Sequence, residues 1–399
     1  MNYQLSERVT SMQESQTLAM ARLARELQAK GVNVIKLNLG EPDFPTPKHI
    51  QEAAIEAIRS EKFFQYPPVP GYPELRKGIA DKLKRDNNLD YKPEQIVVST
   101  GAKQSIANVL LSIIDKGDEV IIFAPYWVSY LEQVRLCEGI PVILKGSLEN
   151  DFKVTAKQLK EAITPKTKAI MFSSPCNPTG SVFSREELRA IAEVLAPHEK
   201  IYILADEIYE YINFVGEHAS IAEFPFIKDR VIIINGFSKG FAMTGWRLGY
   251  IAAPVPIAEA CNKIQGQFTS GACSITQRAA IAAITGSLEP AKEMANAYKR
   301  RRDLLKKLLD EIPGLKTNLP QGAFYFFPDV SAFFGKSYNG TTIHNSYDLA
   351  IYLLNEAHVS IVDGEGFGAP ECIRISFAAS DAELVEAAKR MKEAFAKLR

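Results

Sequence analysis

The sequence has few of the features that would set the protein apart from ordinary globular proteins. Its five cysteines are scattered, odd in number and never arranged as C-x-x-C, which argues against a disulfide framework or a zinc site. No apolar run approaches the roughly 20 residues that a membrane helix needs. The N-terminus lacks the basic start and apolar middle of a signal peptide. We therefore expect a cytoplasmic protein with no metal site and no membrane partner.

The chain also lacks an excess of either charge. Lysine plus arginine and aspartate plus glutamate both number 47, so the net charge is zero, which argues against nucleic acid as a partner. The basic run from Lys299 to Arg302 lies in a helical pattern, and we expect it to form a solvated helix face. Neither a Walker loop nor a G-x-G-x-x-G fingerprint occurs, so the usual signatures of nucleotide binding are missing.

What the chain does contain is a regular alternation of apolar strands and helical patterns. The predicted strands are Ile96 to Ser99, Glu119 to Phe123, Pro141 to Leu144, Lys168 to Ser173, Ile201 to Ala205, Val231 to Asn235 and Leu248 to Ala252. Continuous apolar strands separated by helices predict an α/β fold with a mostly parallel seven-stranded sheet covered on both faces. The link before the last strand is too short for a crossover helix, so that strand is predicted to be antiparallel.

A chain of 399 residues is long enough for two domains. A long helical pattern, Ala291 to Glu311, leads from the sheet region into a smaller α+β unit. We expect a large domain over residues 48–290 and a small domain built from residues 1–47 and 291–399.

Chemically unusual residues follow several predicted strands, at the edge where open parallel sheets bind ligands. Gly101 and Ala102 open a helix whose free N–H groups suit a phosphate. Asp206 follows a buried strand and needs a cationic partner, and Lys239 follows another. Arg247 has a planar guanidinium group, which can bind a phosphate through two hydrogen bonds. Taken singly, these residues are equally compatible with a tight turn, a structural ion pair and a surface lysine.

The segment Ser238 to Arg247, SKGFAMTGWR, resembles the pyridoxal-phosphate (PLP) attachment segment of class I aminotransferases of fold type I. The chain is most similar to the bacterial aspartate aminotransferase subgroup, and the resemblance extends over nearly its whole length. It implies that Lys239 forms the Schiff base with PLP and moves the substrate proton. It also implies that Asp206 keeps the ring nitrogen protonated and that Tyr209 contacts the phenolic oxygen, so these three are the expected catalytic residues.

The same resemblance implies the other cofactor contacts. We expect a phosphate site formed by Gly101, Ala102, Lys103, Ser238 and Arg247. Trp127 is expected to stack on the ring, and Asn177 is expected to join Tyr209 at the phenolic oxygen. Tyr72 matches a tyrosine that reaches the cofactor of the neighbouring subunit, which implies a homodimer with shared sites.

On the substrate side, the resemblance implies that Arg374 clamps the α-carboxylate with help from the backbone of Gly40, next to Trp127 and Asn177. Lys103 is expected to bind the distal carboxylate, assisted by the hydroxyl groups of Ser15 and Thr17. Relatives that also accept prephenate carry a basic residue where Gln13 stands, which argues against prephenate as a substrate.

The expected function is therefore that of an aspartate aminotransferase, which uses PLP to transfer the amino group of L-aspartate to 2-oxoglutarate. Other PLP reactions on the same fold remain open, namely alanine, aromatic or broad-specificity transamination and β-elimination. A PLP-bound regulatory protein without turnover is the alternative outside the enzymes. Activity ratios on aspartate, alanine, phenylalanine and cystathionine would separate the enzymatic readings.

Overall fold

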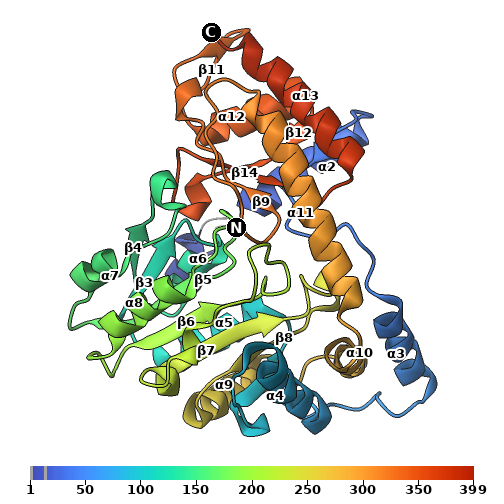
Figure 1. Cartoon of the computed structure of the whole chain (residues 1–399), viewed down its shortest axis with the longest axis vertical. Helices are drawn as coiled ribbons and strands as arrows, with labels where there is room; N and C mark the ends of the chain where they lie inside the picture. The colour runs from blue at the N-terminus through green and yellow to red at the C-terminus, as the bar shows by residue number, and fades with distance from the viewer. Residues whose placement is uncertain (1–2, 13–15) are drawn as a thin grey trace.

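The computed structural model of the chain describes residues 3–12 and 16–399, and its largest element is a seven-stranded sheet (Figure 1). The strands lie in the order β2-β8-β7-β6-β5-β3-β4. Their bounds are Ile96–Ser99 for β2, Glu119–Ala124 for β3, Ile140–Lys145 for β4, Thr167–Ser173 for β5, Tyr202–Asp206 for β6, Val231–Gly236 for β7 and Gly249–Ala252 for β8. Each lies where the sequence predicts a strand, within one residue at either end.

The direction of the strands also agrees with the prediction. β3, β4, β5, β6 and β7 run parallel to one another, whereas β8 is antiparallel to both β2 and β7. The connection from β7 to β8 holds no helix longer than the three-residue turn Thr244–Trp246, so the chain reverses without a crossover. Because β2 and β7 are both antiparallel to β8, β2 points the same way as the parallel strands, and their carboxyl ends meet at one edge.

Helices cover both faces of this sheet, and successive strand residues pack into the two resulting cores. On β5, for example, Ile170 belongs to one core and Met171 to the other. The first core includes residues of α3 (Lys48–Arg59), α4 (Pro73–Asn87), α7 (Ala156–Ala162), α8 (Arg185–Leu195) and α10 (Ser274–Thr285). The second includes residues of α5 (Ala102–Ile113), α6 (Ser129–Leu136) and α9 (Val255–Phe268).

A smaller unit lies beyond the long helix α11 (Glu289–Asp310), in the upper part of Figure 1. Its strands form the sheet β13-β14-β9 and the pairs β1-β12 and β10-β11. The strand bounds are Ile35–Lys36 (β1), Tyr325–Phe326 (β9), Ser337–Tyr338 (β10), Thr341–Thr342 (β11), Val359–Ser360 (β12), Val362–Asp363 (β13) and Ile373–Ser376 (β14). Its helices include α2 (Gln16–Ala29), α12 (Ser346–Tyr352) and α13 (Asp381–Lys397), and α1 (Glu7–Thr10) precedes them.

Both ends of the chain contribute to the core of this unit, from Met20 on α2 to Phe395 on α13. This shared core supports the proposed division into residues 48–290 and the two flanking segments. None of the described helices, α11 included, combines the length and the apolar character needed to cross a membrane.

The expectation that Lys299 to Arg302 forms a solvated helix face is wrong for two of its four residues. Arg301 and Arg302 on α11 are both buried, each with 7% of its surface exposed. The guanidinium of Arg301 donates two hydrogen bonds to Asp43, at 2.8 and 2.9 Å, and a weaker one to Asp381 at 3.3 Å. Arg301 therefore connects α11 to the loop before α3, because its planar guanidinium group can donate two parallel hydrogen bonds to one carboxylate.

Candidate active site

The carboxyl ends of the parallel strands open onto a cavity of ≈ 520 Å³ that residues of both units line. The predicted site residues on its wall are Thr17, Gly40, Ala102, Lys103, Trp127, Asn177, Asp206, Tyr209, Ser238, Lys239, Arg247 and Arg374. Such a concave site with a few convergent polar groups is the usual form of a small-molecule site. Ser15, like Gln13, lies outside the described residues, so the structure does not place it.

Lys239 lies in the loop that follows β7 and is half-buried in the cavity wall. Its Nζ donates a hydrogen bond to the backbone oxygen of Gly40 and lies 5.8 Å from the centre of the Tyr209 ring. Burial lowers the pKa of Lys239 to about 8, and although Glu41 acts in the opposite direction, the cationic Arg374 and Arg247 lower it further. The amine therefore loses its proton far more readily than an exposed lysine does.

Asp206, the last residue of β6, presents a buried carboxylate to the cavity. Its Oδ2 accepts a hydrogen bond of 2.5 Å from the hydroxyl of Tyr130, and its Oδ1 accepts one of 3.2 Å from the backbone N–H of Ile208. Burial raises the pKa of Asp206 to about 6, against the lowering effect of these two hydrogen bonds. A carboxylate in this setting favours a cationic partner.

Tyr130 is a site residue that the sequence analysis missed. It lies on α6, is 1% exposed, and contacts Trp127 edge to face with the ring centres 5.6 Å apart. Its position three residues after the predicted ring-stacking Trp127 is a signal that sequence reasoning could have used, since such residues share a helix face. Its bond to Asp206 joins residues 76 positions apart, which no local pattern indicates.

The predicted phosphate site lies at the start of α5. Gly101 has a φ of +85°, and a Cβ at this residue would lie 2.5 Å from Nη2 of Arg247, so glycine permits a close approach that other residues would prevent. The first N–H groups of α5 have no partner within the helix, and the positive end of the helix dipole adds to their field. With Arg247 and Ser238 on the same cavity wall, this arrangement suits an anion.

Arg374 on β14 is a buried cation that pairs with no carboxylate among the described residues. Its guanidinium donates to Oδ1 of Asn177 at 2.9 Å and to the backbone oxygen of Asn38 at 2.7 Å, and no described partner accepts from its Nε. Burial lowers the pKa of Arg374, against the effects of the neighbouring tyrosines. A structural role would require a buried acidic partner, and the lack of one here favours the binding of a substrate anion.

Tyr325 on β9 is a second residue that the sequence analysis missed. Its hydroxyl shares a hydrogen bond of 2.7 Å with that of Tyr209, and the guanidinium of Arg374 lies 4.5 Å from the centre of its ring. A Cβ at Gly40 would lie 2.5 Å from the same hydroxyl, which explains the glycine at this point of the loop. A lone tyrosine among the phenylalanines of residues 324–327 was the only available sequence signal.

Lys103 and Thr17 reach the cavity from opposite units. Lys103 on α5 has its Nζ 5.0 Å from the centre of the Trp127 ring, and burial, together with Arg247, lowers the pKa of Lys103. Thr17 lies in the first turn of α2. A lysine and a hydroxyl group at the cavity wall are suitable partners for a second carboxylate of the substrate.

Tyr72 lies outside the cavity of its own chain. It precedes α4, its backbone N–H donates to Oε1 of Gln277 at 2.8 Å, and its ring meets that of Phe63 edge to face. In the same loop the side chain of Tyr66 is far more accessible, at 92% exposure. The predicted contact of Tyr72 with a neighbouring subunit stays a prediction.

Comparison with known proteins agrees with this geometry. The family model for aminotransferase class I and II matches residues 32–391. The chain belongs to this family.

Individual relatives are similar over almost the whole chain. A bifunctional aspartate aminotransferase and glutamate/aspartate-prephenate aminotransferase from Petunia hybrida is 49% identical over 98% of this chain and 82% of its own length. The aspartate aminotransferase of Geobacillus stearothermophilus is 45% identical over 97% of this chain and 98% of its own. Among solved structures, the aspartate aminotransferase of Rhizobium meliloti superposes with a TM-score of 0.96 and 39% identity over all of both chains.

Proposed function

We propose that this aminotransferase is an aspartate aminotransferase, which transfers the amino group of L-aspartate to 2-oxoglutarate and releases oxaloacetate and L-glutamate. The observation that carries the proposal is the convergence of Lys239, Asp206 and Arg374 on one cavity. An amine that readily loses its proton, a buried carboxylate and a buried guanidinium without a carboxylate partner are the three groups that transamination of an α-amino acid needs. Full-length relatives that are named aspartate aminotransferases support the choice of substrate.

The residues on the cavity wall fit PLP, the cofactor that membership of the family implies. Asp206 offers a buried anion for the ring nitrogen, and Lys239 offers the amine for covalent attachment. The start of α5, Ser238 and Arg247 would hold the phosphate, while Trp127 would cover the ring face. When bound, PLP supplies an electron-accepting ring next to the substrate α-carbon.

The protein's own groups then account for binding and proton transfer. The guanidinium of Arg374 would hold the substrate α-carboxylate through two parallel hydrogen bonds. Nζ of Lys239 would remove the α-proton and return it as general base and then general acid, a task suited to a pKa of about 8. Lys103 would bind the distal carboxylate of either aspartate or 2-oxoglutarate.

The proposed test combines a coupled assay with a spectrum. The purified protein mixed with PLP should turn yellow and convert aspartate and 2-oxoglutarate, and Lys239→Ala should abolish both the colour change and turnover. A variant with the spectrum and activity of the wild-type protein would end the proposal. Faster turnover of alanine, phenylalanine or cystathionine than of aspartate would favour one of the other PLP reactions instead. Colour without turnover of any substrate would favour a regulatory protein.

We further propose a cytoplasmic homodimer with shared active sites. Large aromatic side chains are exposed on the chain, with 67% exposure for Phe64, 92% for Tyr66 and 68% for Phe268, and aromatic residues are enriched at subunit contacts. All five cysteines are free, as is usual in a reducing compartment. Sedimentation equilibrium would test the dimer, because a monomer at micromolar concentration would contradict it.

A further inference from the structure

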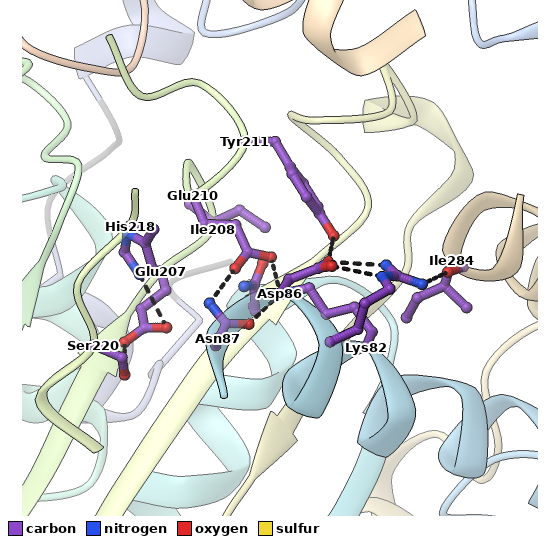
Figure 2. A network of polar contacts seen from close by, with 12 residues as sticks. Lys82, Asp86, Asn87, Glu207, Ile208, Glu210, Tyr211, His218, Ser220 and Ile284 are labelled. Atoms are coloured by element: carbon purple, nitrogen blue, oxygen red, sulfur yellow. Dashed lines mark hydrogen bonds and ion pairs between the residues drawn. The ribbon is translucent and has the colours of Figure 1, made fainter. Parts of the chain in front are cut away.

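The turn at residues 206–210 has two chemically different sides. Asp206, Ile208 and Tyr209 line the cavity. Glu207 and Glu210, by contrast, are absent from the cavity wall and are buried, with 3% and 7% of their surfaces exposed. Figure 2 shows their carboxylates within a network of polar side chains from other parts of the fold. Burying two carboxylates directly beside catalytic residues is costly unless each of them is paired.

Glu210 is paired with the last turns of α4. The ammonium group of Lys82 donates to Oε1 of Glu210 and, at 2.8 Å, to Oδ1 of Asn87, while Nδ2 of Asn87 donates to Oε2 of Glu210 at 3.2 Å. The side chains of Lys82 and Glu210 are 1% and 4% exposed. The next residue, Tyr211, donates its hydroxyl to Asp86 at 2.7 Å. The end of α4 thus holds the far end of the turn.

Glu207 is paired with the segment that leads away from the turn. Its Oε1 accepts a hydrogen bond of 2.6 Å from the hydroxyl of Ser220, and its Oε2 lies 3.2 Å from Nε2 of His218. Burial disfavours a charged imidazole, but the carboxylates of Glu207 and Glu210 leave the pKa of His218 above its usual value. Glu207 and His218 therefore form a close buried pair, which is an ion pair whenever the imidazole is protonated.

A metal ion is the other occupant to consider, because Glu207, Glu210 and His218 offer ligand atoms that lie within 4.8 Å of one another. The Lys82 ammonium already pairs with Glu210, and the imidazole of His218 lies against Glu207. A divalent cation would meet the Lys82 ammonium next to Glu210, which disfavours its binding. The charge of Glu210 is balanced without a metal.

Backbone hydrogen bonds hold the turn at its start and just beyond its end. The N–H of Glu207 donates to the oxygen of Ile234 at 2.8 Å, and the oxygen of Ile212 accepts from Ala323 at 2.8 Å. Between these two points, Glu210 bonds back to Glu207 at 2.9 Å. The sheet holds Asp206 through β6, and the hydroxyl bond to Tyr325 holds the ring of Tyr209, so the backbone between them is the part that relies on the anchored glutamates. Packed ion pairs can fix such a position, because a charge left unpaired in the interior is strongly unfavourable.

We propose that Glu207 and Glu210 are positioning residues, whose buried contacts with His218 and Lys82 hold the turn between Asp206 and Tyr209 so that both face the cofactor. This inference rests on the proposed PLP-dependent function. Neither glutamate touches the cavity, so both act through their neighbours on the turn, and the charge of Glu207 also raises the pKa of Asp206 directly. Small displacements of groups that bind a cofactor are enough to lower its affinity.

The test uses Glu207→Gln and Glu210→Gln, which keep the side-chain shape but remove the charge. Each should raise the dissociation constant of PLP, titrated into the PLP-free protein and followed by tryptophan fluorescence, by about tenfold or more. Each should also shift the pH at which the visible absorbance of the bound cofactor changes, by about half a unit or more, because that spectrum reports on the ring next to Asp206. Ser220→Ala, which keeps every charge, should show a smaller effect in the same direction.

The matched control is Glu187→Gln, which breaks an ion pair with Lys153 of 2.7 Å away from the cavity wall. It should leave the PLP dissociation constant within about twofold of the wild-type value. The positioning role would be overturned if Glu207→Gln and Glu210→Gln lowered thermal stability but left PLP affinity and the spectrum as in this control. If both variants failed to fold, an unchanged Ser220→Ala would overturn it. Failure of the wild-type protein to bind PLP would instead overturn the proposed function.

Discussion

The guanidinium of Arg374 donates a hydrogen bond of 2.9 Å to Oδ1 of Asn177, although the two residues are 197 positions apart in the chain. The bond connects β14 of the smaller unit with the loop after β5 of the larger one. Because Oδ1 of Asn177 accepts from Arg374, its Nδ2 group is the part of the amide left to donate to a ligand. One contact thus links the proposed substrate clamp to the proposed cofactor contact.

We expect Arg374→Lys to reduce kcat/KM for aspartate at least about 30-fold, equivalent to about 2 kcal/mol, because a lysine cannot replace the bidentate fork. Most of the loss should appear as a higher KM. Steady-state kinetics over a range of aspartate concentrations measure this effect. The visible spectrum with PLP serves as the control and should be retained; wild-type kcat/KM in the variant would exclude Arg374 as the carboxylate clamp.

Lys103→Ala should change which substrate the enzyme prefers. If Lys103 binds the distal carboxylate, its removal should lower activity on aspartate by about tenfold or more and leave activity on alanine within a few-fold. The ratio of kcat/KM for aspartate to that for alanine is the quantity to compare between variant and wild type. A ratio that does not change would show that another residue selects the dicarboxylic substrate.

The pKa of Lys239 gives a stability prediction with a definite sign. Burial lowers this pKa from 10.5 to about 8, so between these values the unfolded chain binds more protons and the stability of the PLP-free protein rises with pH. Below pH 8 the folded state carries the full penalty of a buried ammonium, on the order of 3 kcal/mol. Lys239→Met should therefore be more stable than the wild-type protein at pH 7, and its advantage should shrink as the pH approaches 10.5.

Urea denaturation of the PLP-free proteins at a series of pH values measures this difference in the free energy of unfolding. Lys62→Met is the control, because Lys62 is exposed and its removal should give no such pH-dependent gain. A Lys239→Met protein that is less stable than the wild-type protein at pH 7 would contradict the lowered pKa.

Much of the fold and of the site could be predicted because the signals are local. The strands consist of continuous apolar runs; Asp206 ends one of them, and Gly101 and Lys239 follow two others within three residues. The short link before β8 was enough to predict its direction. The motif around Lys239 supplied the remaining roles by resemblance. Each of these signals lies within a few residues of the feature that it predicts.

The parts that could not be predicted depend on contacts between distant segments. Arg301 belongs to a basic run that reads as a solvated face, yet it is buried because Asp43, 258 positions away, folds against it. The pairing of Glu210 with Lys82 spans 128 positions, and that of Tyr209 with Tyr325 spans 116. Burial of a charged or polar group is decided by its partner, and a single sequence does not identify that partner.

The absence of a basic residue at Gln13 leads to a prediction about prephenate. The protein should convert prephenate much more slowly than aspartate, even though the Petunia hybrida relative carries prephenate aminotransferase in its name. Gln13→Lys should raise the ratio of prephenate to aspartate activity by about tenfold, since a new cation offers a partner to the second carboxylate of prephenate. Direct assay of both substrates with both proteins decides the matter; prephenate activity equal to aspartate activity in the wild-type protein would refute the interpretation.

Tyr130→Phe tests whether the hydroxyl next to Asp206 adjusts the acidity of that carboxyl group. The 2.5 Å hydrogen bond stabilises the ionised form of Asp206, so its loss should raise a pKa that is already about 6. A less ionised carboxyl group pairs less well with a protonated ring, so kcat should fall by about tenfold, and the acid limb of the pH–rate profile should move to higher pH. Tyr250→Phe, which alters another buried tyrosine of the large sheet, is the matched control and should leave the profile in place. An unchanged acid limb in Tyr130→Phe, with kcat as in the control, would show that the Tyr130 hydroxyl has no effect on the ionisation of Asp206 and that the side chain serves only for packing.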